Sequence, residues 1–326
     1  MMRRVLFFGT SEFAVPSLLA LLKAGYELPA VVTQPDRPTG RHLRLQPTPV
    51  RRAAEEQGLT VWTPEKVRRA DFLEQARALS PDVIVVAAFG QILPKSLLEM
   101  PSSGWAINVH ASLLPKYRGA APIQHAILNG ETETGVTIMQ MEPTLDTGPI
   151  LLQRTCPILP DDDAGTLEVK LAEMGAELLV ETLHALEQGT VIPRPQNHSL
   201  ATYAPPITRE HSFIHWEESA RQTWCRVRAM SPKPGAGFFW NEKWVKVWKC
   251  LPADEHTDQP PGTVLKVEKQ SVAVACGEGT VLHLLEVQPE SRPRMSAGDW
   301  ARGARLRNGS MFTPFHAVES TGESTD

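Results

Sequence analysis

The chain has 326 residues, a formal net charge of -4 at pH 7 and a pI near 6.2. This length fits two domains of ordinary size, each with its own core. Because the net charge is slightly negative, overall charge does not hold the chain on nucleic acid or on a membrane, and any anionic partner has to be met by a local cluster of basic residues. The 4 cysteines lie far apart in the sequence and include no Cys-x-x-Cys pair, which excludes a zinc ribbon and a disulfide framework.

The N-terminus places basic residues before the apolar run VLFF, which is too short for the apolar region of a signal peptide. Nowhere does the sequence contain the roughly 18 consecutive apolar residues of a membrane span. We therefore expect a cytoplasmic protein without a membrane partner. The first apolar run continues into FGTSEF, which is neither a dinucleotide-binding fingerprint nor a phosphate-binding Walker loop, so a nicotinamide or ATP role loses its main support.

Up to about residue 190, short apolar runs alternate with helix-like segments. The runs cover residues 4–8, 30–33, 82–88 and 105–110. This alternation predicts an α/β fold with an open, mostly parallel sheet, and continuous runs such as VIVVAA indicate strands that are buried on both faces. Thr48-Pro49 is expected to begin one helix, and Asp163 is expected to cap a long helix that ends near Gly189.

Residues 36–52 read DRPTGRHLRLQPTPVRR, with five arginines and one acidic residue. A solvated loop and a phosphate-binding loop explain this composition about equally well.

The stretch INVHASLLPKYRG, residues 107–119, brings Asn108 and His110 to the end of a predicted strand. Side chains two residues apart on a strand point to the same side, and the carboxyl ends of parallel strands are where ligands bind in such sheets. The alternative is that Asn108 closes a turn and that His110 is an ordinary half-buried histidine. Asp146, in MEPTLDTGPIL, is expected in a turn between two strands, where an aspartate commonly bonds its own backbone.

Residues 193–206, PRPQNHSLATYAPP, are rich in proline and polar residues and are expected to form a linker. A helix is expected near 217–230, followed by closely spaced strands that predict a small antiparallel barrel or sandwich. Trp244 and Trp248 flank Lys246 on one strand face, a pattern that suits either RNA binding or, more commonly, core packing.

These segments together resemble the methionyl-tRNA formyltransferases. The similarity rests on FGTSEFAVPSL, TQPDRPTGR, INVHASLLPKYRGAAPIQHAILNGETETGVTIMQM, LDTGPIL, GTVL and MSAGDW. It implies a Rossmann-like, mostly parallel sheet followed by a small, OB-like β-barrel. The implied organisation is a formyltransferase catalytic domain at 1–192, a linker at 193–207, a tRNA-binding domain at 208–318 and a disordered tail at 319–326.

The resemblance also implies the site residues. The catalytic residues would be Asn108, His110 and Asp146; those that hold the co-substrate 10-formyltetrahydrofolate would be Ser112, Leu113, Leu114 and Pro115; and those that contact initiator methionyl-tRNA would be Arg37, Arg41 and Arg44. No metal is implied, and a monomer is expected. After Gly40-Arg41 this chain reads HLRL where several family members carry lysines. Rival interpretations are a formyltetrahydrofolate hydrolase, a sugar-amine formyltransferase and a pure RNA-binding module.

The chemistry agrees with this assignment. Attack of an amine on a formyl carbon gives a tetrahedral intermediate with an oxyanion, which needs a preorganised hydrogen-bond donor such as the Asn108 amide. His110 can take the proton of the amine or stabilise the oxyanion, and Asp146 can orient the imidazole.

Overall fold

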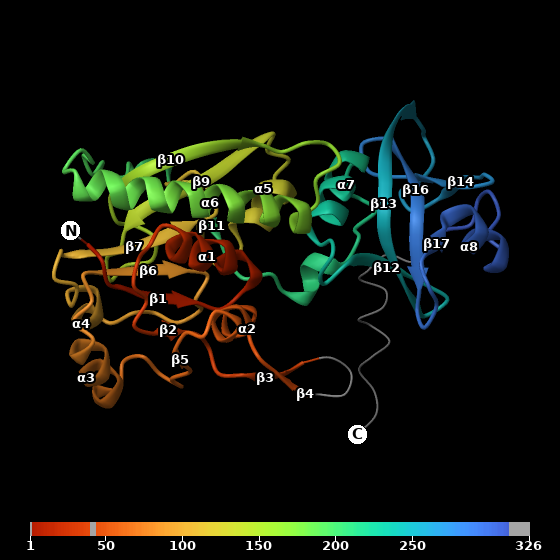
Figure 1. The fold of residues 1–326 in the computed structure, drawn as a ribbon. Helices are drawn as coiled ribbons and strands as arrows, with labels where there is room; N and C mark the ends of the chain where they lie inside the picture. Colours follow the sequence, from red (N-terminus) through yellow and green to blue (C-terminus); the bar gives the residue numbers. More distant parts are fainter. Residues whose placement is uncertain (1, 40–43, 313–326) are drawn as a thin grey trace, which may run out of the picture. The chain divides into compact units, whose positions relative to one another are not determined.

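The computed structural model describes residues 2–39 and 44–312 (Figure 1). The described chain divides into two compact units. The first consists of the chain up to Pro122 together with Glu133–Pro157 and Glu168–Pro205, and the second consists of Ile123–Thr132, Ile158–Leu167 and the chain from Pro206 onward. These units interleave along the sequence, so the domain bounds expected from the sequence, with a single division at 193–207, stay a prediction. The predicted disordered tail lies outside the described residues.

The first unit contains a seven-stranded sheet in the order β10-β9-β7-β6-β1-β2-β5. Its strands are β1 (Val5–Gly9), β2 (Val31–Val32), β5 (Val61–Trp62), β6 (Val83–Ala87), β7 (Trp105–His110), β9 (Glu133–Gln140) and β10 (Ile150–Pro157). From β7 to β5 all neighbours are parallel, whereas β9 runs antiparallel to both β7 and β10. Every residue of β1 and β6 is buried, which confirms the prediction of a mostly parallel sheet with doubly buried central strands.

Two faces of this sheet are covered by different helices. The helices of the first unit are α1 (Val15–Lys23), α2 (Pro49–Glu56), α3 (Ala70–Ala78), α4 (Lys95–Leu98) and most of α6 (Ala164–Glu187), with short 3-10 turns η1 (Glu12–Ala14) and η2 (His198–Leu200). Phe72 of α3 and Leu97 of α4 share one apolar core with Phe8 of β1. On the other face α6 approaches β7 so closely that a Cβ on Gly175 would lie 2.9 Å from Val109.

The predicted helix boundaries are confirmed by their caps. The Thr48 hydroxyl accepts from the Arg51 backbone N–H at 3.1 Å and so begins α2. Asp163 accepts from the Thr166 N–H at 2.9 Å at the start of α6, and Gly189 follows its end with a φ of 66°. A side-chain acceptor at each N-terminus satisfies a backbone donor that has no partner within the helix.

The second unit is built on a six-stranded antiparallel sheet in the order β12-β13-β16-β15-β14, with β17 paired to β16. Its strands are β12 (Ala236–Trp240), β13 (Lys243–His256), β14 (Val264–Val267), β15 (Val272–Ala275), β16 (Thr280–Pro289) and β17 (Met295–Ser296). This unit also contains nearly all of α5 (Pro122–Leu128), together with η3 (Arg209–Ser212), α7 (Ala220–Ala229) and α8 (Ala297–Gly303). The antiparallel sheet and the helix near 217–230 are confirmed. Among the described strands, the end strands β12 and β14 are not paired with each other, so closure into an OB-like barrel stays a prediction.

An aromatic cluster forms the core of this second unit. Phe238 and Phe312 lie 4.4 Å apart between ring centroids, and Trp216 and Trp300 pack on them. The four cysteines are buried and form no disulfide, and burial raises the pKa of the Cys276 thiol to about 12. Across the described residues, no helix combines the length and the apolar composition needed to cross a membrane.

Candidate active site

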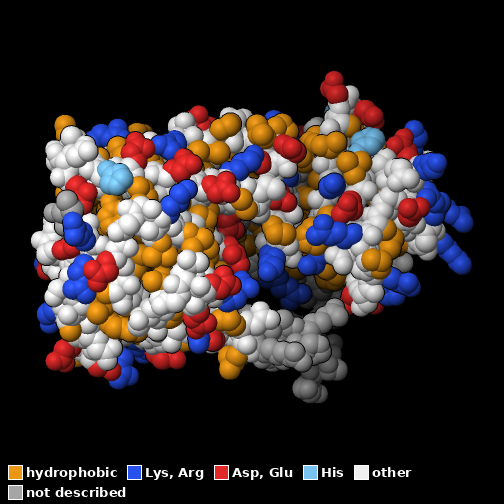
Figure 2. All heavy atoms as spheres, viewed as in Figure 1, with side chains coloured by type: hydrophobic (Ala, Val, Ile, Leu, Met, Phe, Trp, Pro, Cys, Tyr) orange, Lys and Arg blue, Asp and Glu red, His pale blue; other side chains and the backbone are white. Residues whose placement is uncertain are grey.

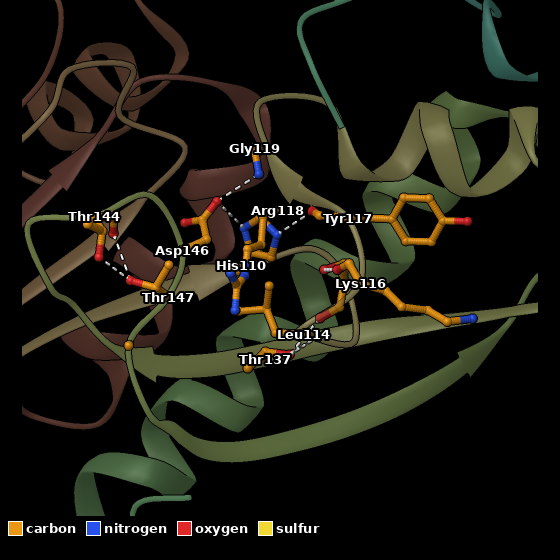
Figure 3. Close-up of polar contacts among 12 residues, drawn as sticks. His110, Leu114, Lys116, Tyr117, Arg118, Gly119, Thr137, Thr144, Asp146 and Thr147 are labelled. Carbon is orange, nitrogen blue, oxygen red and sulfur yellow. Dashed lines mark hydrogen bonds and ion pairs between the residues drawn. The ribbon is translucent and has the colours of Figure 1, made fainter. Parts of the chain in front are cut away.

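His110 is the last residue of β7, and its side chain is only 6% exposed. Its Nε2 lies 2.9 Å from the backbone carbonyl oxygen of Tyr117 (Figure 3). A carbonyl oxygen can only accept, so the imidazole carries a proton on Nε2 and leaves Nδ1 as its basic atom when the ring is neutral. The Tyr117 carbonyl thus selects the tautomer of His110.

Asp146 occupies the turn that joins β9 to β10, as the sequence indicated. Its Oδ2 accepts from the Gly119 N–H at 2.8 Å and lies 3.8 Å from His110 Nδ1. This separation is longer than a direct hydrogen bond, but it places a carboxylate, 11% exposed, beside the basic nitrogen of the histidine. Asp146 also has a φ of 51°, a backbone conformation that is uncommon outside glycine and that recurs at functional sites.

Gly119 permits this geometry because it has no side chain. A Cβ at this position would lie 2.6 Å from the carbonyl oxygen of Ala204, and the φ of Gly119 is 120°. The loop that contains Gly119 can therefore approach Asp146 and a neighbouring strand at the same time.

Asn108 lies two residues before His110 on β7 and is half-buried. Strand alternation puts the two side chains on one face, about 6 to 7 Å apart along the strand. The structure therefore brings His110 and Asp146 together directly, and Asn108 joins them through its place on the same strand face.

The Ser-Leu-Leu-Pro loop follows directly after β7 and is held by hydrogen bonds within the loop and from β9. The Ser112 hydroxyl donates to the Lys116 carbonyl at 2.7 Å, and the side chain is fully buried. Thr137 of β9 donates to the Ser112 carbonyl at 2.6 Å and accepts from the Leu114 N–H at 3.1 Å. Leu114 packs in a small apolar cluster, whereas Leu113 and Pro115 are half-buried. Ser112 and Leu114 turn inward, and the folate contacts expected for this loop stay a prediction.

The arginine-rich loop is only partly described. Arg37 is exposed on β3 (Arg37–Thr39), which pairs with β4 (Arg44–Gln46), and Arg41 lies outside the described residues. The Arg51 guanidinium group forms ion pairs with the neighbouring carboxylates of Asp36 and Glu55, both at 2.7 Å. On the face shown in Figure 2, Lys and Arg side chains are interspersed with acidic and apolar ones.

Trp244 and Trp248 have different surroundings. Trp244 packs on Phe213 and Phe239, with ring centroids 5.3 and 5.0 Å away, which confirms that one of the pair is packing. Trp248 is half-buried, and the Arg294 guanidinium carbon lies 3.8 Å from its ring centroid while Lys246 Nζ lies at 5.5 Å. Trp248 therefore belongs to a cluster of one aromatic and two cationic side chains.

Reasoning from sequence missed three residues around the site, Arg118, Gln196 and Thr202. Arg118 stands inside the motif that contains Asn108 and His110, so its position was a usable signal. Gln196 and Thr202 lie in the segment expected to be a linker, where composition gave no indication of burial. Within the described ranges, no three His, Cys, Asp or Glu side chains are grouped so as to hold a metal ion.

Comparison with known protein families gives two matches. The family model described as formyl transferase matches residues 2–183, and the family model described as formyl transferase, C-terminal domain, matches residues 206–305. Among curated proteins, the methionyl-tRNA formyltransferase of Caldanaerobacter subterraneus subsp. tengcongensis is 47% identical over 95% of this chain and 99% of its own length. The methionyl-tRNA formyltransferase of Enterococcus faecalis is 46% identical over 93% of this chain and 96% of its own length.

Solved structures share the fold. An N-formyltransferase from Helicobacter canadensis, in complex with folinic acid and dTDP-3-aminofucose, superposes with a TM-score of 0.66 at 21% identity, over 87% of this chain and 99% of that one. HypX from Aquifex aeolicus, in complex with tetrahydrofolic acid, gives a TM-score of 0.63 at 17% identity over 96% of this chain. The present chain spans 51% of that HypX chain. At such identities the likeness concerns the fold alone.

Proposed function

The chain belongs to the methionyl-tRNA formyltransferase family, and we propose on this premise that it transfers the formyl group of 10-formyltetrahydrofolate to the α-amino group of methionine on initiator methionyl-tRNA. The observation that carries the proposal is the pairing of His110 with Asp146 at the carboxyl end of β7, because this pair is able to take up the proton that the attacking amine loses.

The proposed base is Nδ1 of His110. The amine attacks the formyl carbon on N10 of the folate, a new C–N bond forms, and the amine nitrogen becomes positively charged. Since Nε2 already donates to the Tyr117 carbonyl, the proton from that nitrogen has to go to Nδ1. The resulting imidazolium is stabilised by the Asp146 carboxylate, which lies 3.8 Å away.

Collapse of the tetrahedral intermediate then breaks the bond between the formyl carbon and N10, and the folate nitrogen takes the proton held by the His110 imidazolium, which returns Nδ1 to its basic form. In the intermediate the former formyl oxygen carries the negative charge. The Asn108 amide is the proposed donor to this oxyanion, because it lies on the same strand face as His110. In this proposal the loop of Ser112, Leu113, Leu114 and Pro115 shapes the folate site through its backbone and through the half-buried Leu113 and Pro115.

Contacts with tRNA are proposed for two regions. One is the loop that carries Arg37, Arg41 and Arg44, where guanidinium groups would bind phosphates. The other is the C-terminal domain, proposed at 208–318, where Trp248 with Lys246 and Arg294 combines an aromatic face with two cations. We also propose that the chain acts as a monomer in the cytoplasm, where translation begins.

One assay with three acceptor conditions tests this function. Purified full-length chain receives 10-formyltetrahydrofolate with charged initiator methionyl-tRNA, with a nucleotide-sugar amine, or with neither, and mass spectrometry identifies the formylated product. Formylmethionyl-tRNA is the expected product. Formylated sugar would identify a sugar-amine formyltransferase, release of formate without an acceptor would identify a hydrolase, and tRNA binding without product would identify an RNA-binding module.

A further inference from the structure

The segment from Arg194 to Ala204, here called the strap, runs beside the two loops that meet at the active site. Arg194 exchanges both of its backbone hydrogen bonds with Ile150, the first residue of β10, at 2.8 and 2.9 Å. At its other end β11 (Tyr203–Ala204) pairs in parallel with β8 (Arg118–Gly119). The strap is therefore bonded on one side to the end of the Asp146 turn and on the other to the loop that follows His110.

Gln196 fixes the Asp146 turn from within the strap. Its Nε2 donates to the carbonyl oxygen of Asp146 at 2.9 Å and to that of Gly148 at 2.7 Å. The residue is 6% exposed, so water does not readily replace these bonds. Both N–H groups of the amide thus hold a turn whose aspartate has an uncommon backbone conformation.

Arg118 fixes the orientation of that amide. It is 2% exposed, and its Nε and Nη2 donate to Gln196 Oε1 at 3.2 and 2.7 Å. Because a guanidinium group has donors only, Gln196 has to present its oxygen to Arg118 and its NH2 group to the turn. Arg118 Nη2 also lies 3.0 Å from His198 Nδ1, which by the same argument is the acceptor.

Thr202 supports the loop that holds His110, the other residue of the pair that His110 forms with Asp146. Its hydroxyl accepts from the Tyr117 N–H at 2.8 Å, and its backbone carbonyl accepts from the Arg118 N–H at 2.9 Å. The carbonyl of Tyr117 in turn accepts from His110 Nε2. A chain of hydrogen bonds therefore runs from the strap to the imidazole through the 115–119 loop, and a second one runs from the strap to Asp146.

We propose that the strap, through Gln196 and Thr202 and together with Arg118 of the loop that follows His110, sets the position of Asp146 relative to His110, so that these three are positioning residues for formyl transfer. This inference rests on the proposed function and extends it. Displacement of a catalytic group by about 1 Å can lower a rate by about 10²-fold, so the strap should affect turnover more than substrate binding.

The first test is Gln196→Glu. Glutamate has almost the same shape and still accepts from Arg118, but an oxygen replaces the NH2 group and repels the carbonyls of Asp146 and Gly148. In the full-length protein kcat for methionyl-tRNA formylation should fall by about tenfold to a hundredfold, and the KM values for folate and tRNA should change by less than about twofold. Asn197→Ala is the matched control, because this exposed neighbour bonds Ser199 inside the strap and should keep the wild-type kcat.

A second variant, which adds no charge, keeps the inference testable if Gln196→Glu does not fold. Thr202→Val, at an exposed position, removes the acceptor of the Tyr117 N–H while keeping the shape of the side chain. We expect kcat to fall by about threefold to tenfold. Thermal unfolding of each variant reports whether it is folded.

A spectroscopic measurement separates this inference from the proposed function. In protein with ¹⁵N-labelled histidine, the ring nitrogen signals of His110 should shift in Gln196→Glu and in Thr202→Val and stay in place in Asn197→Ala. No substrate is needed, so an inactive wild type with shifted His110 signals in the variants would sink the proposed function and leave the strap inference standing. Folded variants with unchanged kcat and unmoved His110 signals would overturn the inference, and so would a loss that resides in KM alone.

Discussion

Asp146→Asn is the change that tests the electrostatic part of the mechanism. Asparagine keeps an oxygen for the Gly119 N–H, so the turn should be preserved, but the negative charge beside His110 is lost. Two unit charges 3.8 Å apart interact by about 4 kcal/mol at an effective dielectric constant of about 20, which is an upper limit here because Asp146 is 11% exposed. An effective contribution of about 2 to 4 kcal/mol predicts a rate about 30-fold to 10³-fold lower.

The assay is single-turnover formylation of charged tRNA with the enzyme in excess, which reports the chemical step rather than product release. Glu142→Gln is the matched control, because it removes one negative charge from the same turn, where Glu142 accepts a long hydrogen bond of 3.4 Å from the Thr147 hydroxyl. The control should stay within about twofold of the wild type. A folded Asp146→Asn protein with less than a threefold loss would refute the reasoning that the carboxylate stabilises the imidazolium.

Three further predictions concern tRNA binding and stability. Arg37→Ala should weaken tRNA binding and reduce the slope of log affinity against log salt by somewhat under one unit, with folate affinity unchanged, and an unaltered slope in a salt titration would count against a phosphate contact. Trp248→Ala should weaken tRNA affinity by about fivefold to 100-fold at fixed salt if a base stacks on the ring, and equal affinities would assign Trp248 to the fold. Asp82→Ala should lower the free energy of unfolding at pH 7 by about 1 to 3 kcal/mol, because Asp82 Oδ2 accepts from the backbone N–H groups of Arg3 and Arg4, both at 2.9 Å.

The Asp82 effect has a defined pH dependence. The backbone hydrogen bond from Arg4 is the main cause that lowers the pKa of this carboxyl group below its ordinary value of 3.8. A lowered pKa in the folded state means that the stabilisation is fully present above the ordinary value and is lost as the pH falls through the folded-state value. Urea unfolding at pH 7 and at low pH should therefore show a wild-type advantage over Asp82→Ala that shrinks with acidification, and a constant difference would contradict this origin.

Much of the fold was predictable because a strand that is buried on both faces needs a continuous run of apolar residues, which is visible in the sequence. The run that became β6, VIVVA, is continuously apolar, and no other element type of that length explains it between polar neighbours. The caps at Thr48 and Asp163 were local signals, since a single side chain satisfies the first free N–H groups of each helix. His110 was singled out by its place at the end of a predicted strand, whereas Asp146 lies in a turn and its role was implied only by the resemblance to the family.

The strap was not predictable, because its structure depends on residues far away in the sequence. Its proline content and polar residues favour an exposed linker, and most of it is exposed. Gln196 is buried only because its amide meets the carbonyls of Asp146 and Gly148, 50 and 48 positions earlier in the chain. No local pattern encodes such a contact, and the resemblance to a family did not single it out.

The central claim is that Asn108, His110 and Asp146 act on one intermediate in the formylation of methionyl-tRNA. The most direct test measures kcat for that reaction in Asn108→Ala, His110→Ala, Asp146→Ala and the three pairwise double variants, with folding and tRNA binding as controls. Each single change should lower kcat by at least about 10²-fold, and each double variant should lose much less than the product of its two single losses. Double variants that lose the full product would show that the three residues act independently, in contradiction to a shared intermediate.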